Sequence, residues 1–82
     1  MHHHFDVEID LHGCHVDEAI RKIESVLYRP QSQSLLLIHG KGTGVLKTAV
    51  RNFIAGNTYV RDYIFGEDVN FPGGDGVVIV YT

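Results

Sequence analysis

The stretch that decides the fold is Leu36-Leu37-Ile38-His39-Gly40-Lys41-Gly42-Thr43-Gly44. A short apolar run ends in a His-Gly pair and a glycine-rich segment, and an apolar pattern with helical spacing follows. The same order occurs earlier, where Ile9-Asp10-Leu11-His12-Gly13 precedes another helical pattern. Two such units in succession predict a βαβα arrangement, in which both turns lie at the same edge of a parallel sheet.

The periodicity of the remaining chain predicts two more strands. Residues 5–11 alternate between apolar and polar side chains, which indicates a strand with one buried and one solvated face. Apolar stripes with helical spacing predict two helices, each on the carboxyl side of a His-Gly turn. The expected segments are helices over Val16–Tyr28 and from Thr43 or Gly44 to Ala55, strands over Leu35–Ile38, Tyr59–Phe65 and Val77–Tyr81, and a long polar loop over Gly66–Gly76.

The predicted fold class is therefore α/β, a two-layer sandwich of order β-α-β-α-β-β with a mixed four-stranded sheet. Right-handed crossovers make the first three strands parallel where they share a sheet, and the fourth strand is expected to run antiparallel to the third. With both helices on one face, the other face stays open, which agrees with the alternating first strand.

Length and composition limit the kinds of protein this can be. The 82 residues allow one domain, assigned to residues 5–82, and a hydrophobic content of 44% indicates a packed core. Met1–His4 is either a shortened purification tag or a native start and is left out of the functional reasoning. No apolar run approaches the roughly 20 residues of a membrane span, and no signal peptide is visible, so no membrane role is expected.

The cysteine count and the net charge indicate the redox environment of the protein and limit how it can bind nucleic acid. Cys14 is the single cysteine, which excludes an internal disulfide or a cysteine-based zinc site and favours a reducing, cytoplasmic environment. The net charge of −3 argues against tight non-specific coating of nucleic acid, although it permits a local basic rim.

Asp10 and His12 form the first candidate constellation. Strand periodicity places both side chains on the open face, about 7 Å apart along the strand. Ligands of open α/β sheets bind at the carboxyl ends of parallel strands, where Asp10 can orient His12 and His12 can move a proton near neutral pH. The alternative interpretation is a solvated strand edge without function.

His39, Gly40, Lys41, Gly42, Thr43 and Gly44 form the second constellation, which we name the glycine-rich turn. Its glycines allow close backbone approach, and the helix that follows directs free N–H groups toward the turn, as in anion-binding sites. Lys47 and Arg51 lie just beyond it, as phosphate ligands or as solvated helix charges. Glycine used for conformation alone remains the alternative for the turn, and a flexible hairpin is the simplest interpretation of Gly73–Gly76.

These motifs together resemble the Smr (small MutS-related) domain family. The resemblance rests on the Asp10-x-His12-Gly13 motif, on His39–Gly44 with Val45 and Leu46, and on Gly73–Gly76 before the last strand. It extends over nearly the whole chain and is strongest to the carboxyl-terminal Smr domain of the second bacterial MutS paralogue. It implies a sandwich similar to the carboxyl-terminal domain of translation initiation factor three.

The resemblance also implies nucleic-acid binding and endonuclease (nicking) activity. The expected substrate is structured DNA or RNA, in recombination suppression or in processing of stalled ribosomes, within a larger MutS-like ATPase. The family pattern maps its catalytic positions onto Asp10, His12 and His39. The low basic content indicates that the rest of a larger protein assists binding.

Two hypotheses follow. In the first, Lys41 and the amides of Gly42–Gly44 hold a scissile phosphate while His12, oriented by Asp10, and His39 transfer protons on its two sides. RNA cleavage then needs no metal, whereas DNA cleavage favours Mg²⁺ or Mn²⁺ held by Asp10 with Glu8. In the second, the same groove is a non-catalytic docking module for nucleic acid or a ribosome.

Overall fold

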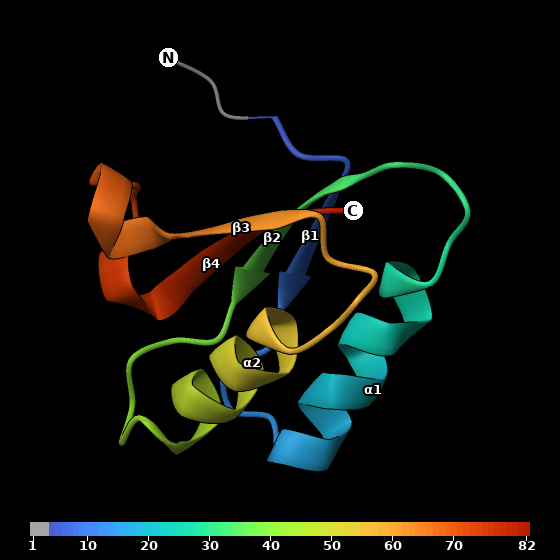
Figure 1. Cartoon of the computed structure of the whole chain (residues 1–82). Coiled ribbons are helices and arrows are strands. Elements are labelled where there is room, and N and C mark those ends of the chain that lie inside the picture. The colour runs from blue at the N-terminus through green and yellow to red at the C-terminus, as the bar shows by residue number, and fades with distance from the viewer. Residues whose placement is uncertain (1–3) are drawn as a thin grey trace.

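A mixed four-stranded sheet carries both helices on one side, which gives a two-layer sandwich (Figure 1). The computed structural model describes residues 4–82. The predicted order of strands and helices is confirmed, with two short 3₁₀-helices added before the last strand. The elements are β1 (Val7–Asp10), α1 (Val16–Leu27), β2 (Ser34–Ile38), α2 (Val45–Ala55), β3 (Asp62–Phe65), η1 (Gly66–Val69), η2 (Gly74–Gly76) and β4 (Val77–Tyr81).

The sheet has the order β1-β2-β4-β3. β1 and β2 pair in parallel, and β4 runs antiparallel to both β2 and β3. The first three strands therefore point the same way, as predicted, but β4 lies between β2 and β3. β2 and β4 are the two uninterrupted apolar runs of the sequence, and apolar side chains on both faces are what a central strand requires.

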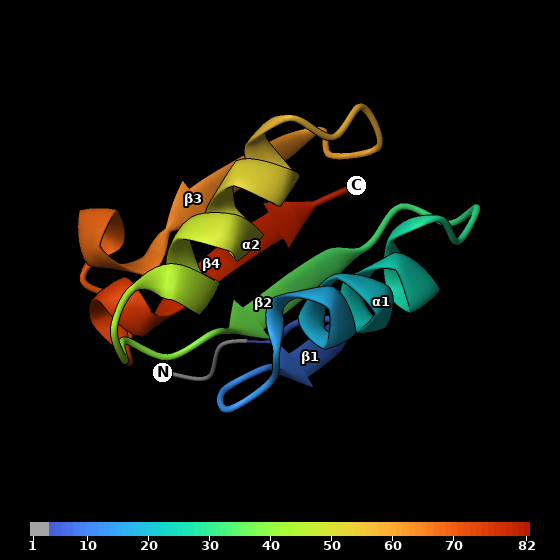
Figure 2. The same ribbon diagram turned by 90° about the horizontal axis from the view of Figure 1, so that it is seen from below.

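The main core lies between the sheet and the helices. Seen from the helix side, α1 lies across β1 and β2, and α2 lies across β4 and β3 (Figure 2). Each helix turns its apolar stripe inward, since burial of one face supplies most of the stability of a short helix. The buried side chains of this core are Leu11, Ala19, Ile23, Val26, Leu27, Leu35, Leu37, Val50, Ile54, Val78 and Val80.

The opposite face of the sheet is less open than expected. Leu36, Val77 and Ile79 form a second buried cluster there, against which Phe5 and Phe71 pack. The two phenylalanine rings meet edge to face, with centroids 5.7 Å apart. The prediction of a long polar loop over Gly66–Gly76 is wrong. This segment folds into η1 and η2 and thereby brings Phe71 over the sheet.

The boundaries differ from prediction mainly at β3, which begins at Asp62 and not at Tyr59. Asn57 ends the preceding segment as a turn, accepting a hydrogen bond from the Tyr59 amide through Oδ1 and another from the Val60 amide through its carbonyl. In residues 4–82, no helix has the length and apolar character needed to cross a membrane.

We expect Gly66→Ala to destabilise the domain because Gly66 begins η1 against the backbone of η2. A Cβ at this position would overlap the Gly74 carbonyl oxygen and the Val77 Cγ2 methyl. Forcing an extra carbon into a packed site typically costs about 1–3 kcal/mol of unfolding free energy, which urea denaturation measures.

Gly56→Ala is the matched control, since its Cβ would lie an ordinary 3.5 Å from the Asn52 carbonyl oxygen. This variant should change stability by less than about 1 kcal/mol. Equal losses in both variants would contradict the packing argument.

Candidate functional site

The two His-Gly turns are neighbours at one edge of the sheet. The β1–β2 ladder continues past the strands, with the Leu11 amide donating to the Ile38 carbonyl at 2.7 Å. A Cβ built on Gly40 would lie 3.4 Å from the His12 Cβ. Parallel pairing of β1 with β2 therefore brings together two motifs that are 27 residues apart, counted from His12 to His39.

A third turn, at the start of β4, completes this edge. The carbonyl of Gly76 accepts hydrogen bonds from the amides of both His39 and Gly40, at 3.0 and 2.9 Å. β4 runs antiparallel to β2, so its first residues meet the last residues of β2. The Gly73–Gly76 segment, interpreted from sequence as a flexible hairpin, is thus hydrogen-bonded to the glycine-rich turn.

Asp10 and His12 form a hydrogen-bonded pair at the surface. Asp10 Oδ1 lies 2.5 Å from His12 Nδ1 and also accepts the His12 amide at 3.2 Å. The side-chain hydrogen bond, supported by the backbone one, holds the pKa of the Asp10 carboxyl below its usual value. A carboxylate on Nδ1 leaves Nε2 as the ring nitrogen that faces solvent, because the His12 side chain is 73% exposed.

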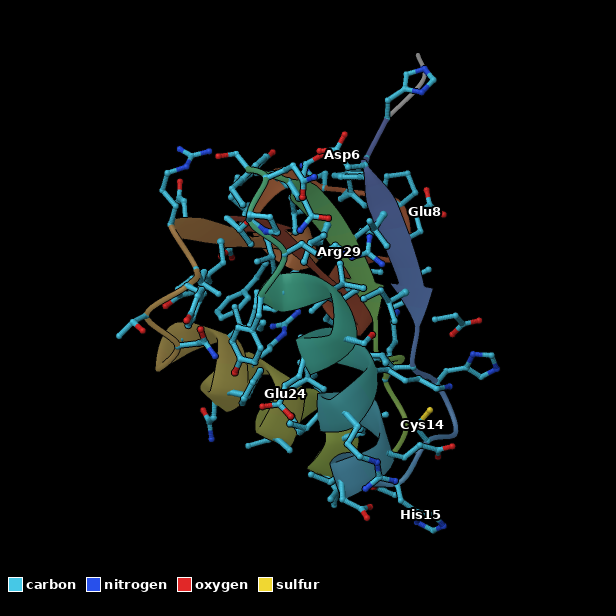
Figure 3. All side chains as sticks on the ribbon, turned by 90° about the vertical axis from the view of Figure 1, so that its right-hand side faces the viewer. Asp6, Glu8, Cys14, His15, Glu24 and Arg29 are labelled. Atoms are coloured by element: carbon cyan, nitrogen blue, oxygen red, sulfur yellow. The ribbon has the colours of Figure 1, made fainter. Side chains whose placement is uncertain are left out.

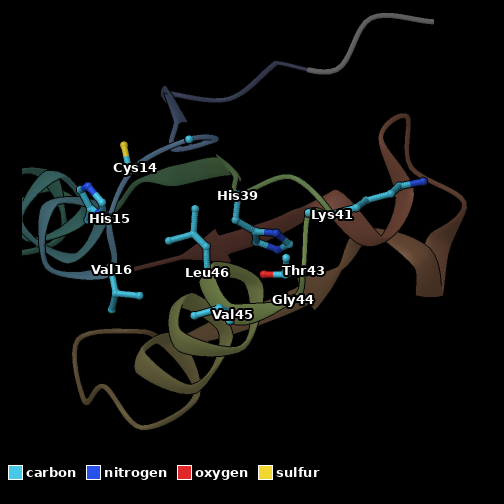
Figure 4. Close-up of a pocket in the computed structure, with 11 residues that line it drawn as sticks. Cys14, His15, Val16, His39, Lys41, Thr43, Gly44, Val45 and Leu46 are labelled. Carbon is cyan, nitrogen blue, oxygen red and sulfur yellow. The ribbon is translucent and has the colours of Figure 1, made fainter.

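A pocket of about 300 Å³ lies between the glycine-rich turn and the start of α1 (Figure 4). Its lining begins at Gly13, the residue after His12, and includes neither Asp10 nor His12. The amino ends of both helices border it, and the first-turn amides of an α-helix have no partner within the helix. In α2 the first helical bond is donated by Thr48 to Gly44, which adopts φ 90° and caps the helix without a side chain. The lining residues are Gly13, Cys14, His15, Val16, His39, Lys41, Gly42, Thr43, Gly44, Val45 and Leu46.

Lys41 and Lys47 are paired with a carboxylate of the third turn. Lys41 Nζ lies 3.2 Å from Asp75 Oδ1, and Lys47 Nζ lies 3.6 Å from Oδ2. The hydrogen bond from Lys41, with the nearby charge of Lys47, keeps the pKa of Asp75 below its ordinary value. Asp75 therefore neutralises part of the predicted basic rim, a contact that the sequence interpretation of Gly73–Gly76 missed.

His39 is buried and both of its ring nitrogens are occupied. Its exposed fraction is 3%, and Nδ1 lies 2.7 Å from the carbonyl oxygen of Gly40. Nε2 accepts a hydrogen bond from Arg51 Nε at 3.2 Å. Burial, with the charges of Arg51 and Lys47 as smaller causes, lowers the pKa of the imidazole. The sequence predicts His39 as a second proton-transfer group, and in the structure both of its ring nitrogens already have partners within the domain.

Arg51 points inward and does not line the pocket. Its Nη atoms form two hydrogen bonds with the Glu67 carboxylate, at 2.7 and 2.8 Å, and Nη2 donates to the Val77 carbonyl at 3.0 Å. The guanidinium also lies over the Phe65 ring, 4.1 Å from its centroid. The prediction that Arg51 contacts phosphate is not supported by this position. Glu67 had no sequence signal, since it falls in the segment expected to be a loop.

The carboxylates considered for a divalent cation lie on β1. Glu8 extends outward from the strand, while Cys14 and His15 stand farther along in the loop that enters α1 (Figure 3). Magnesium sites in proteins commonly use one or two carboxylates together with substrate phosphates, which Glu8 and Asp10 fit in ligand type. Within residues 4–82, no group of three or more His, Cys, Asp or Glu side chains is arranged to hold a metal ion.

The Arg51–Glu67 pair should make stability depend on pH in the acid range. The bidentate hydrogen bond from Arg51 lowers the pKa of Glu67 from 4.5 to about 2. Because the folded-state value is the lower one, the pair stabilises the fold fully above about pH 4.5, and this stabilisation is lost as the pH falls toward 2. Glu67→Gln should therefore destabilise the domain more at pH 7 than at pH 2.5, as measured by urea denaturation at both values.

Asp68→Asn removes a neighbouring exposed carboxylate and serves as the control for net charge. A loss in Glu67→Gln that is equal at both pH values, or equal to that in Asp68→Asn, would contradict the assignment.

Comparison with known proteins shows the family of this chain. The Smr domain family profile matches residues 9–82. The chain is 38% identical over 76 residues to Endonuclease MutS2 of Pelotomaculum thermopropionicum, covering 89% of this chain and 9% of that protein. It is 42% identical over 76 residues to Endonuclease MutS2 of Clostridium acetobutylicum, again with 88% and 9% coverage. The chain thus spans about a tenth of the length of these curated relatives.

A solved structure supports the same assignment. The crystal structure of the Smr domain of Thermus thermophilus MutS2 superposes with a TM-score of 0.74 at 34% identity, covering 89% of this chain and 92% of that one. The family match over residues 9–82, the sequence relatives and the shared fold lead to one conclusion. The chain belongs to the Smr domain family.

Proposed function

We propose that this domain binds nucleic acid at the glycine-rich turn and cleaves a phosphodiester with the help of His12. The observation that carries the proposal is the exposed Asp10–His12 pair beside the pocket that the glycine-rich turn borders. The relatives named Endonuclease MutS2 support a nuclease, and their greater length supports a setting within a larger MutS-like protein.

Lys41 and the backbone amides of Gly42–Gly44 bind the phosphate in this proposal. A helix amino terminus attracts an anion through its free N–H groups and its dipole, and α2 presents both to the pocket. Lys41 is largely exposed, so its ammonium can leave Asp75 for a phosphate oxygen. Lys47, whose ammonium faces the same carboxylate, adds positive charge behind the turn.

His12 transfers the proton, and Asp10 orients its ring. With RNA, neutral His12 accepts the proton of the 2′-hydroxyl at Nε2, and the resulting oxygen attacks the adjacent phosphorus. The 5′-oxygen then leaves with a proton from solvent, and the products are a 2′,3′-cyclic phosphate and a free 5′-hydroxyl. Asp10 holds the ring in the tautomer that this step requires and stabilises the imidazolium that forms.

Cleavage of DNA would follow a different course because water must attack. A Mg²⁺ or Mn²⁺ ion would supply an activated water there, with Asp10 and Glu8 as its carboxylate ligands. Asp10 would then exchange its hydrogen bond with His12 for the metal. We favour RNA as the substrate class, since the Asp10–His12 hydrogen bond is already arranged for it.

A non-catalytic docking module for nucleic acid or a ribosome is the second candidate. The difference between His12 and His39 favours this candidate. Of these two side chains, His12 alone presents a ring nitrogen to solvent, because both ring nitrogens of His39 have partners within the domain. A cytoplasmic setting fits both candidates, given the single free cysteine.

We expect His12→Ala to slow cleavage by about 10²–10⁴-fold while binding is kept, because a general base contributes about that much. The assay uses labelled structured RNA and supercoiled DNA, each with Mg²⁺, with Mn²⁺ and with EDTA. His4→Ala, on the amino-terminal side of β1, is the matched control and should cleave as the wild type does. An unchanged rate in His12→Ala would overturn the catalytic role, and no cleavage by the wild type on any substrate would favour the docking module.

Asp75→Asn should tighten binding of the same RNA by about two- to fivefold, the equivalent of a surface ion pair of up to about 1 kcal/mol. The reason is that the Asp75 carboxylate competes with phosphate for Lys41 and Lys47. Lys41→Ala should weaken binding and reduce the salt slope by about 1. Fluorescence anisotropy at several salt concentrations measures both effects.

Asp68→Asn makes the same change in net charge at a carboxylate outside the ion pairs that Asp75 forms with Lys41 and Lys47. Equal tightening in Asp75→Asn and Asp68→Asn would mean that net charge, and not local competition, sets the affinity.

A further inference from the structure

We propose that Arg51, held by Glu67, is a positioning residue: it fixes His39 as the neutral imidazole with its proton on Nδ1, and His39 in turn orients the peptide between Gly40 and Lys41. The proposal deepens the proposed function, since the oriented peptide belongs to the phosphate-binding turn. It also replaces the proton-transfer role of His39 that the sequence predicts.

The first step is the rigidity of the guanidinium. Two hydrogen bonds with Glu67 fix its plane, the Val77 carbonyl accepts a third at 3.0 Å, and the Phe65 ring covers one face. Arginine stays protonated at all accessible pH values and has no acceptor atom. Arg51 Nε therefore always presents a hydrogen to His39 Nε2, which must offer its lone pair.

The second step follows from the chemistry of a neutral imidazole. If Nε2 is the acceptor, Nδ1 carries the proton, and the acceptor within reach is the Gly40 carbonyl oxygen at 2.7 Å. The amide of Gly40 is also held, since it donates to the Gly76 carbonyl at 2.9 Å. Gly40 is thus fixed at both its N–H and its C=O, with φ at 78°.

The third step concerns the next amide. In a trans peptide the C=O and N–H groups point in opposite directions. With the Gly40 carbonyl directed at the buried His39 ring, the N–H of Lys41 points away from that ring. Arg51 thereby sets the direction of an amide in the turn that we propose to hold the phosphate, although it does not line the pocket itself.

The charges around His39 favour the same state. Arg51 and Lys47 from α2 oppose a positive charge on the ring, whereas Glu67 from η1 and the Gly40 carbonyl favour one. Burial outweighs these and lowers the pKa of His39. Protonation at Nε2 would also set two donors against each other, because Arg51 Nε–H already points there.

The decisive measurement is the tautomer of His39, read from the long-range ¹H–¹⁵N NMR spectrum of its ring at pH 7. We expect a protonated Nδ1 and an acceptor-type Nε2. The spectrum of His39→Gln assigns the signals. A doubly protonated ring, or a proton on Nε2, would overturn the proposal, and neither reading depends on the domain having nuclease activity.

Arg51→Lys and Glu67→Gln test the positioning role, since a lysine cannot bridge His39 and Glu67 with a planar fork. In each folded variant we expect the Nδ1–H tautomer to lose its dominance and the Lys41 amide signal to shift. Because small misplacements of reacting groups cost up to about 100-fold in rate, kcat for the RNA should fall by roughly that factor in Arg51→Lys, with KM changed less.

Arg61→Gln is the matched control, since the Arg61 guanidinium lies over the Tyr81 ring at the far end of β4, and its loss should leave every readout unchanged. Wild-type tautomer and kcat in both Arg51→Lys and Glu67→Gln would overturn the positioning role. If the wild type cleaves nothing yet shows the Nδ1–H tautomer that Arg51→Lys loses, the positioning of the turn stands and the proposed nuclease function fails.

Discussion

The buried fork of Arg51 is the interaction on which the rest of this site depends. It joins the middle of α2 to the carboxylate of Glu67 in η1, to the first residue of β4 and to the histidine that follows β2. A buried guanidinium is tolerated only when its donors are satisfied, and here His39, the half-exposed Glu67 carboxylate and the Val77 carbonyl accept from it. Four segments of the chain are thereby held in one arrangement at the edge where the turns meet.

Charge at this edge is balanced within the domain. Arg51 is paired with Glu67, and Lys41 and Lys47 with Asp75, so the segment before β4 supplies the carboxylates for the cations of the second turn and α2. In the function we propose, an acidic domain with a net charge of −3 offers a phosphate one local site without attracting nucleic acid over its whole surface. The proposed function then makes affinity depend on the strength of the ion pairs that Asp75 forms with Lys41 and Lys47.

The two histidines illustrate how one local motif acquires opposite chemistry. Both follow an apolar strand and precede a glycine, yet His12 is exposed beside a carboxylate and His39 is buried beneath a guanidinium. The difference arises because β1 is an edge strand, whereas β2 pairs with β4 and is covered by the third turn. Solvent access, and not the motif, decides which imidazole can exchange a proton.

The sequence by itself determined the order of the elements, the two layers, the direction of the first three strands and the meeting of the His-Gly turns, because hydrophobic period and right-handed crossovers are local or general constraints. Only the tertiary structure decided that β4 lies between β2 and β3, that Gly66–Gly76 folds over the sheet through Phe71, and that Arg51 turns inward to Glu67. These features depend on pairs far apart in the chain. Hydrophobic periodicity does not predict which residue a given arginine will contact. The burial of Arg51 therefore depends on the Glu67 carboxylate and the Val77 carbonyl, which the fold brings to it.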